Sequence, residues 1–386
     1  MSGALSIGVV SDYLEEGWPS MDLAAELIAS AANAGAGPFR AELLRPPMRR
    51  LLSRPPVSGG FAFNGDRALN RFLFYPRWLR TEARRHDLFH VVDHSYAHLA
   101  LALPAGGTAV TCHDLDSFRV LWSEGGPAIH RHIAKRIAAG LRRAAVVICP
   151  SRATRDELAN SGLVPAARIR VTPNPVHPCF ESEPGPEARD EAARLLGGGE
   201  PLVLHAGSNI ARKRIDVLLA AFALVRCRWP GARLVRTGSL TPAQRNQAVA
   251  LGVAGARVEL PPVGRETLAA IYSRAALTVL PSDREGFGWP MVESLARGVP
   301  VVATDLAVFR ETGADSAVYA CAGDPASFAR LMERLLDERR ARPESWEARR
   351  RRARARSEAF GMAAYARGLG AIYEELKENR KCLERL

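Results

Sequence analysis

The sequence predicts an α/β protein of two domains, each built on a parallel sheet. Short apolar runs typical of buried parallel strands alternate with helical patterns along the chain. A chain of 386 residues is too long for one compact core. A proline-rich break at residues 173–186 interrupts the alternation, because proline continues neither a helix interior nor a central strand.

The first domain is expected at residues 1–172, with residues 357–386 returning to it. Its strands are apolar runs closed by turn residues. The predicted strands are Ser6–Val10, Leu88–Val92, Thr108–Thr111 and Ala145–Cys149, and the predicted helices include Met21–Ala34, Ile129–Ala144 and Thr154–Ser161.

A linker is expected at residues 173–188, and a second domain at residues 189–356. The same alternation of strand and helix patterns continues there. The predicted strands are Leu202–Ala206, Arg233–Thr237, Val258–Leu260, Leu277–Leu280 and Val301–Ala303; the predicted helices include Ile215–Cys227, Arg265–Ala275, Pro290–Ala296 and Pro325–Leu336, with a last helix over Ser357–Lys377.

Composition narrows the class of protein. The hydrophobic fraction of 47% is that of a globular protein, and no run is long enough to span a bilayer. Residues 1–10 lack the charged region and cleavage site of a signal peptide. The 6 cysteines show no zinc-site spacing and no disulfide framework. We therefore expect a cytoplasmic protein.

The net charge of +12 is concentrated in two arginine-rich segments. Residues 40–85 hold 11 Arg against 3 acidic residues, and residues 339–356 hold 9 Arg against 2. Apolar and aromatic residues interrupt the first segment, which favours an anionic membrane surface over a plain solvated face. The second segment predicts an exposed helix at residues 349–356. No nucleic-acid-binding motif accompanies either segment, so no nucleic-acid partner is expected.

Residues 285–293 lie between a predicted buried strand and a predicted helix. Pro290 suits a first helical position, and Gly298 suits the residue just past the helix end. The backbone N–H groups of Phe287, Gly288 and Trp289 then lie where a helix begins. That arrangement favours an anion, typically a phosphate.

Two carboxylates, Glu285 and Glu293, flank this expected anion-binding site. A carboxylate accepts two hydrogen bonds side by side, and a ribose diol donates two. The segment therefore fits a sugar–diphosphate–nucleoside. The alternative is that Glu293 only complements the positive end of its helix and Glu285 is a solvated loop residue.

The residues of this segment resemble the sequence signature of the retaining family-four (group 1) glycosyltransferases. The matching residues are Glu285-Gly286-Phe287-Gly288, Pro290 and Glu293, then Ala296, Gly298 and Pro300-Val301-Val302. The resemblance implies the GT-B fold, with two Rossmann-like domains facing across a cleft. It also implies that the second domain binds a nucleotide sugar, and that the final helix crosses back to the acceptor-side first domain.

The resemblance also implies roles for these residues. Glu285 approaches the donor sugar, the amides of Phe287 and Gly288 hold the diphosphate, and Glu293 holds the ribose. Trp289 stands where the family more often has a smaller apolar residue, so it either reshapes the sugar pocket or packs.

A cationic loop follows the strand predicted at Leu202–Ala206. The strand enters a turn at Gly207-Ser208, and Arg212-Lys213 follow. Cations at such a position neutralise a diphosphate and the charge that develops as it leaves. By resemblance Lys213 matches the family's lysine. Ser208 stands where many relatives have arginine, so Arg212 serves instead or that contact is missing. A basic surface loop is the alternative.

His113 and Asp114 close a predicted strand of the first domain. Ligands of open α/β sheets bind beyond the carboxyl ends of strands. Relatives have a His-Asp pair here, with the histidine near the donor sugar, and the resemblance gives His113 that role. A hydrogen-bonded loop histidine is the alternative.

Two further features of the first domain bear on ligands. The resembled family has a Gly-rich loop after its first strand, beside the acceptor and the donor phosphate, and Gly17 is the one glycine that remains there. The spacing of His90, Asp93, His94 and His98 suggests a metal site, but the family needs no metal. We therefore expect no metal and no other cofactor.

The resemblance implies a hexosyltransferase that moves a sugar from a nucleotide sugar to a glycan, lipid-linked or small-molecule acceptor with retention of configuration. The resemblance implies same-face attack, in which the leaving diphosphate takes the acceptor's proton, and the sequence shows no separate nucleophile at a strand end near the motif. Glycan or glycolipid biosynthesis, at the inner membrane face if the basic segment binds lipid, is the expected setting. Two alternatives remain: a catalytically degenerate nucleotide- or membrane-binding protein, and a GT-B sugar-nucleotide epimerase.

Overall fold

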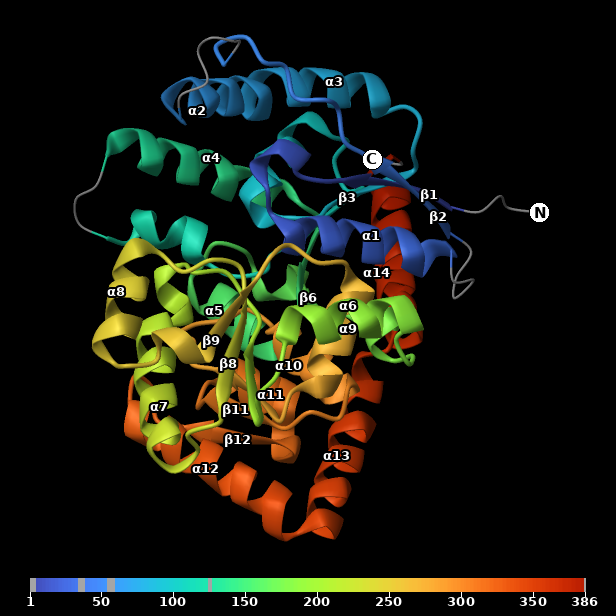
Figure 1. Ribbon diagram of the computed structural model, residues 1–386. Coiled ribbons are helices and arrows are strands. Elements are labelled where there is room, and N and C mark those ends of the chain that lie inside the picture. Colours follow the sequence, from blue (N-terminus) through green and yellow to red (C-terminus); the bar gives the residue numbers. More distant parts are fainter. Residues whose placement is uncertain (1–4, 34–38, 54–59, 124–126, 385–386) are drawn as a thin grey trace. The chain divides into compact units, whose positions relative to one another are not determined.

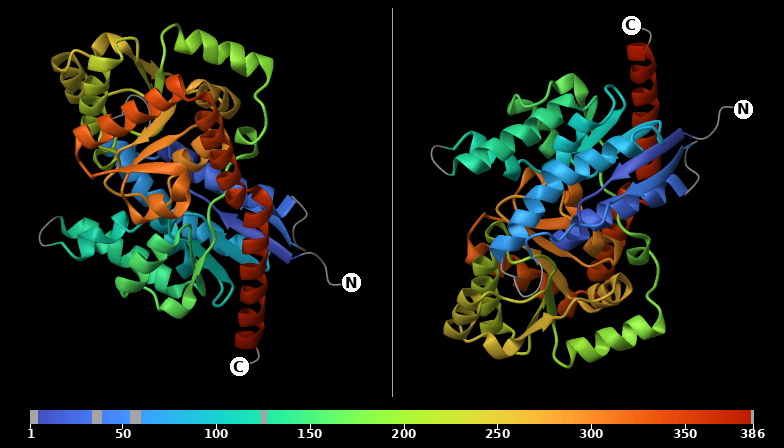
Figure 2. Two further views of the ribbon diagram at one scale, coloured as in Figure 1. Left: turned by 90° about the horizontal axis from the view of Figure 1, so that it is seen from below. Right: turned by 90° about the horizontal axis from the view of Figure 1, so that it is seen from above.

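The computed structural model describes residues 5–33, 39–53, 60–123 and 127–384, and it divides the chain into two compact units (Figures 1 and 2). Unit 1 comprises residues 1–174 and 362–386, and unit 2 comprises residues 175–361. Each unit contains one parallel sheet of 6 strands. The predicted α/β class, with one parallel sheet in each of two domains, is confirmed.

The sheet of unit 1 has the strand order β2-β1-β3-β4-β5-β6, and all neighbouring pairs are parallel. Its strands are β1 (Leu5–Val10), β2 (Phe39–Leu44), β3 (Leu88–Val91), β4 (Thr108–Thr111), β5 (Val146–Cys149) and β6 (Ile169–Val171), and its helices are α1 (Pro19–Asn33), α2 (Gly60–Leu69), α3 (Tyr75–Glu82), α4 (Ala128–Arg143), α5 (Arg152–Asn160) and α14 (Met362–Glu384). β1, β3, β4 and β5 confirm the predicted strands. β2 and β6 were not predicted, because both contain side chains that are partly exposed and neither forms a continuous apolar run.

The final helix, α14, belongs to unit 1 and packs against α1 and β3 (Figure 1). Tyr373 anchors α14 in the core of unit 1. The Tyr373 hydroxyl lies 2.8 Å from His90 Nδ1, and the Tyr373 ring packs edge-on against Phe39. The return of the last helix to the first domain is therefore confirmed. Its predicted start at Ser357 is wrong, because a 3-10 turn, Glu358–Phe360, and extended backbone at Gly361 separate α14 from the preceding helix.

The sheet of unit 2 has the strand order β12-β11-β10-β7-β8-β9. Its strands are β7 (Leu202–His205), β8 (Arg233–Thr237), β9 (Arg257–Leu260), β10 (Leu277–Leu280), β11 (Val301–Thr304) and β12 (Ala317–Ala320), and its helices are α6 (Pro186–Leu196), α7 (Ile215–Arg228), α8 (Pro242–Ala250), α9 (Arg265–Arg274), α10 (Trp289–Ala296), α11 (Ala307–Gly313), α12 (Pro325–Ala341) and α13 (Pro343–Ser357). All strands run parallel, so their carboxyl ends share one edge, and the loops after β7 and β10 meet there.

The second arginine-rich segment forms α13, and several of its side chains have internal partners. Arg350 donates to the carbonyl of Gly298, and Arg356 donates to the carbonyls of Thr312 and Glu311. Arg349 pairs with the buried carboxylate of Glu338. The prediction of a simply exposed helix was therefore wrong in part, because these arginines bond to neighbouring elements of unit 2.

The first arginine-rich segment contains one long helical rod in unit 1: α2, a π-helical segment at Asn70–Phe74, and α3 (Figure 1). The carboxylate of Asp66 fastens the preceding loop to this rod. It accepts hydrogen bonds from the backbone N–H groups of Leu51, Leu52 and Ser53 at 2.8–2.9 Å. The side chains of Leu51 and Leu52 remain 44% and 49% exposed. None of the described helices is long and apolar enough to cross a membrane.

Candidate active site

Glu285 lies in the loop after β10 of unit 2, where its buried carboxylate meets two cations. Its Oε2 lies 3.0 Å from Arg212 Nη1, and its Oε1 accepts a hydrogen bond from Lys213 Nζ. Ser282 Oγ also donates to Oε1, at 2.8 Å. Burial alone would raise the pKa of Glu285, but Lys213 and Arg212 outweigh it and hold the pKa below its usual value. The structure thus brings Glu285, Arg212 and Lys213 into direct contact.

The two loops that carry these residues are clamped to each other. The N–H of Asp283 donates to the carbonyl of Arg212 at 2.8 Å. Arg214, in the left-handed region at φ +47°, bonds to Asp283 at 3.0 Å and to Asp216 at 2.8 Å. Left-handed backbone is unfavourable for arginine, and the two ion pairs offset that strain. The clamp therefore fixes the positions of Arg212 and Lys213.

Helix α10 begins beside this cluster and presents its N-terminus without a side-chain cap. Gly288, its N-cap residue, has φ +87°, and a Cβ atom there would lie 2.8 Å from Phe309. Only glycine therefore fits this turn. The uncapped first N–H groups carry the positive end of the helix dipole, which favours an anion.

Glu293 lies one turn into α10, and 8% of the residue is exposed. Its Oε2 accepts a hydrogen bond from the Tyr272 hydroxyl at 2.9 Å. Burial raises the pKa of Glu293 to about 7, although Tyr272, Arg265 and Lys213 act in the opposite direction. Unlike Glu285, this carboxyl has no cation in direct contact among the described residues.

The predicted turn after β7 lies beside the same lysine. A Cβ atom on Gly207 would lie 3.7 Å from Lys213 Cε, so glycine leaves room for the lysine side chain. The N–H of Gly207 donates to Thr237 Oγ1 at 2.9 Å. Ser208 follows in this turn, and Arg212 rather than Ser208 reaches Glu285.

Trp289 packs within unit 2. Its indole Nε1–H donates to the carbonyl of Pro175 at 3.1 Å, and its ring meets that of Phe287 at 6.2 Å between centroids. The ring of Phe287 is buried. These contacts favour packing over the alternative in which Trp289 reshapes a sugar pocket.

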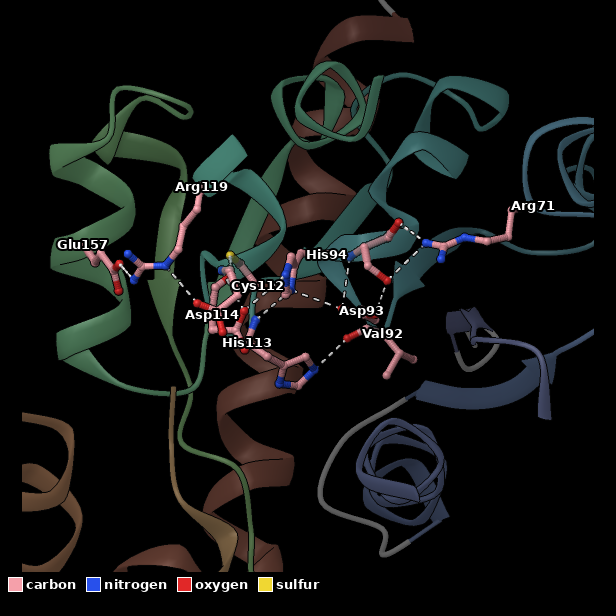
Figure 3. Close-up of polar contacts among 11 residues, drawn as sticks. Arg71, Val92, Asp93, His94, Cys112, His113, Asp114, Arg119 and Glu157 are labelled. Carbon is pink, nitrogen blue, oxygen red and sulfur yellow. Dashed lines mark hydrogen bonds and ion pairs between the residues drawn. The ribbon is translucent and has the colours of Figure 1, made fainter. Parts of the chain in front are cut away.

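In unit 1, His113 follows β4 and is buried (Figure 3). Its Nε2–H donates to the carbonyl of Val92 at 2.9 Å. Burial lowers the pKa of His113, so the ring is neutral at pH 7 and Nδ1 can act only as an acceptor. The local geometry thus fixes the tautomer of the predicted catalytic histidine.

A second histidine of this edge, His94, lies between two carboxylates (Figure 3). Its Nδ1 is 3.1 Å from Asp93 Oδ1, and its Nε2 is 3.6 Å from Asp114 Oδ1. Burial alone would lower the pKa of His94, but Asp93 and Asp114 outweigh it and raise the pKa above its usual value. Sequence reasoning assigned His94 no role apart from the metal alternative.

Gly17 closes a 3-10 turn, Leu14–Glu16, after β1, with φ +67°. The side chain of Glu16 anchors this turn, since it accepts a hydrogen bond from the Tyr96 hydroxyl at 2.6 Å and pairs with Arg67 at 2.9 Å. Gly17 itself is exposed, and a Cβ atom there would contact nothing within 4 Å. Its role in substrate binding stays a prediction.

The histidines that suggested a metal by their spacing hold structural hydrogen bonds instead. His90 uses both ring nitrogens, toward Tyr373 and Thr111, and His98 Nε2 donates to the carbonyl of Arg71. No group of three His, Cys, Asp or Glu side chains within the described ranges could hold a metal ion.

Comparisons with known proteins agree with this geometry. The family described as "Glycosyltransferase Family 4" matches residues 10–179, and "Glycosyl transferases group 1" matches residues 200–338. The chain belongs to the family 4 (group 1) glycosyltransferases. Curated relatives of this glycosyltransferase include D-inositol 3-phosphate glycosyltransferases from Acidothermus cellulolyticus, 34% identical over 44% of this chain, and Nocardiopsis dassonvillei, 36% identical over 39%. These matches span 41% and 38% of the relatives' own lengths.

Solved structures confirm that the glycosyltransferase has the GT-B fold. Sucrose-phosphate synthase from Thermosynechococcus elongatus has a TM-score of 0.71 at 20% identity, over 96% of this chain and 99% of that one. Anabaena HepE, solved with UDP and glucose, has a TM-score of 0.72 at 16% identity over the same shares. WaaG, of lipopolysaccharide biosynthesis, has a TM-score of 0.69 at 15% identity, over 95% and 99%.

Sequence reasoning missed two buried polar residues of the glycosyltransferase, His205 and Arg236. Arg236 donates to the carbonyls of Gly238 at 2.9 Å and Gly207 at 3.3 Å, and so ties together the loops after β7 and β8. Burial lowers the pKa of His205 to about 3, so this ring beside Gly207 is neutral. A signal was present for His205, the one polar residue of the run Leu202–Ala206, but not for Arg236, whose strand also contains Arg233 and Thr237.

Proposed function

We propose that this glycosyltransferase moves a sugar from a nucleoside diphosphate sugar to an acceptor hydroxyl with retention of configuration. The observation that carries the proposal is the meeting of Lys213, Arg212 and Glu285 in unit 2, beside the uncapped N-terminus of α10. Two cations and a row of backbone N–H groups suit a diphosphate. Glu285 pairs with both cations and holds them in place.

In the proposed reaction the acceptor oxygen forms a bond to the anomeric carbon on the face from which the diphosphate leaves. The bond from that carbon to the phosphate oxygen breaks, and the acceptor's proton passes to the leaving phosphate. Lys213 and Arg212 stabilise the charge on the diphosphate as it departs. Glu285 orients the sugar, and His113 accepts a sugar hydroxyl at Nδ1. Glu293 accepts both hydroxyls of the ribose.

The first experiment is thermal unfolding of wild type and Glu293→Ala with UDP, GDP and ADP. UDP is the leading candidate, because the structurally similar HepE was solved with UDP. Stabilisation of wild type by one nucleotide, with a smaller shift in the variant, is the expected result. The same nucleotide's sugar is then tested for transfer, and NMR of the product reports the anomeric configuration. If no nucleotide stabilises wild type, the proposal is wrong, and an inverted product would refute retention alone.

We further propose that the acceptor is a lipid-linked glycan at the cytoplasmic face of an anionic membrane. Unit 1 exposes apolar side chains near arginines on the loop and rod described above: Leu51 at 44%, Leu52 at 49%, Phe61 at 95% and Leu73 at 38%. Apolar side chains with neighbouring cations suit the headgroup boundary of such a membrane. This setting accords with glycan or glycolipid biosynthesis.

Sedimentation with vesicles tests the membrane proposal. Wild type should sediment with vesicles that contain phosphatidylglycerol and remain in the supernatant with phosphatidylcholine alone. Leu52→Asp with Phe61→Asp should lose about tenfold in partitioning or more. Val249→Asp, which changes a side chain of unit 2 that is 66% exposed, is the matched control and should bind like wild type. Equal partitioning of the double variant and wild type would contradict the proposal.

A further inference from the structure

Asp12 carries a carboxyl group that is buried at the carboxyl edge of the unit 1 sheet, beside the carboxyl group of Asp93. It lies two residues beyond β1, and only 2% of the residue is exposed. Neither carboxyl oxygen receives a hydrogen bond from a donor in the described part of the chain. A buried carboxyl without donors is unfavourable for folding, so its presence at a sheet edge where ligands bind indicates a binding function.

The charged groups that act most strongly on Asp12 are Asp93, Arg71 and Glu16. Burial, and the negative charge of Asp93, raise the pKa of Asp12 well above its usual range. Asp93 is held in its ionised form by His94. Burial and Asp93 therefore favour the protonated form of Asp12, whose proton then lies between Asp12 and Asp93, as between two adjacent carboxyls. Its second oxygen is then an acceptor for a hydroxyl donor.

The cations at this edge already have carboxylate partners. Arg67 and Arg71 both pair with Glu16, at 2.9 and 3.5 Å, and His94 lies between two aspartates. Arg71 belongs to the π-helical segment, and its guanidinium also lies 4.1 Å from the centroid of the Tyr96 ring. π-helical segments are frequent at functional sites.

We propose that Asp12, supported by Asp93, accepts a hydrogen bond from a hydroxyl of the acceptor, and that the acceptor end bound here is an unphosphorylated sugar or polyol. At Asp12 the negative charges of Asp93 and Glu16 would act against a phosphate, and Arg71, the cation that acts on Asp12, already pairs with Glu16. The inference rests on the proposed glycosyl transfer and names its acceptor class. It separates this chain from relatives that are named for a phosphorylated acceptor, D-inositol 3-phosphate.

In this proposal the turn Leu14–Gly17 shifts to admit the hydroxyl to Asp12. This turn follows Asp12 directly, and 60% of Leu14 is exposed to solvent. Glu16, within the turn, acts electrostatically on Asp12. Gly17 has a positive φ, a backbone conformation that residues other than glycine rarely adopt, so the chain can bend at this position.

The test uses two matched pairs of probes with the full chain: myo-inositol against D-inositol 3-phosphate, and D-glucose against D-glucose 6-phosphate. Saturation-transfer NMR measures binding of each probe in the presence of the nucleotide that stabilises the protein. Wild type should bind each unphosphorylated member at least about tenfold more tightly than its phosphorylated partner. Asp12→Ala should weaken binding of the unphosphorylated probes by about tenfold or more.

Two variants separate binding from folding. Asp12→Asn keeps a carbonyl oxygen as an acceptor and adds no charge, so it should retain more binding than Asp12→Ala at equal or higher thermal stability. Glu15→Ala removes an exposed carboxylate from the same turn and should behave like wild type. In every variant the nucleotide affinity should be unchanged, because the nucleotide is assigned to unit 2.

Three results would overturn the inference: preference for a phosphorylated probe, no saturation by either unphosphorylated probe, or equal binding by wild type and Asp12→Ala. Each leaves nucleotide binding intact. Failure of the proposed glycosyl transfer would instead appear as wild type that binds no nucleotide, so the two failures are distinguishable.

Discussion

Unit 1 and unit 2 both place ionised side chains after parallel strands, but with opposite charge arrangements. In unit 2 one anion, Glu285, lies between two cations, Lys213 and Arg212. In unit 1 one histidine with a raised pKa, His94, lies between two carboxyl groups, Asp93 and Asp114. The same architecture thus presents a net positive cluster on one sheet edge and a net negative cluster on the other.

The opposite charges of the two clusters suggest that the two units bind different parts of the substrates. A positive cluster beside a helix N-terminus stabilises a diphosphate both as a bound ligand and as a leaving group. A negative cluster with a neutral acid repels phosphates and accepts hydroxyl donors. A reaction that joins an anionic donor to a hydroxyl acceptor needs one of each, and this is the basis of the proposals above.

The largest expected effect comes from removing the central cation of unit 2. Lys213→Ala should lower kcat by about 100- to 1000-fold, because it removes a charge that stabilises the leaving diphosphate. Steady-state transfer kinetics with the stabilising nucleotide sugar would measure it.

Arg330→Ala is the matched control for Lys213→Ala. Arg330 is an arginine of α12 whose side chain is 69% exposed, and it pairs only loosely with Asp324 at 3.9 Å. Its loss should change kcat by less than about threefold. Comparable losses in both variants would show that general surface charge, not the Glu285 cluster, is responsible.

A smaller effect is expected at Glu293, the carboxyl of unit 2 without a cationic contact. Glu293→Ala should weaken nucleotide binding by about 10- to 100-fold, since two hydrogen bonds to a carboxylate are lost. Isothermal titration with the stabilising nucleotide would measure it.

The affinity for nucleotide should also depend on pH through Glu293. Its pKa in the free protein is raised to about 7, so protonation removes the acceptor form as pH falls below 7. Wild-type affinity should therefore fall by up to about tenfold per pH unit below 7. Glu293→Gln should show a flat profile over the same range; a sloping profile in that variant would assign the titration to another group.

The smallest effects are expected in stability, and they have opposite signs of pH dependence in the two units. The pKa of His94 is raised in the folded protein, so its contribution is full below its unfolded pKa and is lost as pH rises through the folded value. The pKa of Glu285 is lowered, so its contribution is present above its unfolded pKa and is lost as pH falls through the folded value.

Urea unfolding against pH would measure this contrast. His94→Gln should remove the loss of stability on the alkaline side, and Glu285→Gln should remove the loss on the acid side. Parallel profiles for the two variants would contradict the charge arrangements described here.

Much of the fold could be predicted because its signals are local. The strand that precedes Glu285 and the helix that carries Glu293 follow from apolar runs and from the positions of Pro290 and Gly298. The strands β2 and β6 were missed, because their side chains are partly exposed and lack a continuous apolar pattern. The start of α14 was missed because a 3-10 turn continues the helical pattern of the sequence.

The site was predicted less completely, because its electrostatics depend on residues far apart in the chain. Glu285 and Glu293 belong to one motif, yet their pKa values shift in opposite directions. Lys213, 72 positions away from Glu285, causes the first shift, and burial near Tyr272 causes the second. The isolation of Asp12 was equally hidden, since a sequence does not show which donors a buried carboxyl lacks.

The carboxylate of Asp66 has a consequence for membrane binding. Burial alone would raise its pKa, but the hydrogen bonds from Ser53 and from the N–H groups of Leu51 and Leu52 hold the pKa well below its usual value. The loop that bears these leucines is thus ordered before any encounter with lipid. Flexible segments lose conformational entropy when they insert, whereas this one has already lost it during folding. The proposed membrane contact of unit 1 is therefore entropically pre-organised, and a single aspartate beneath the surface sets that property.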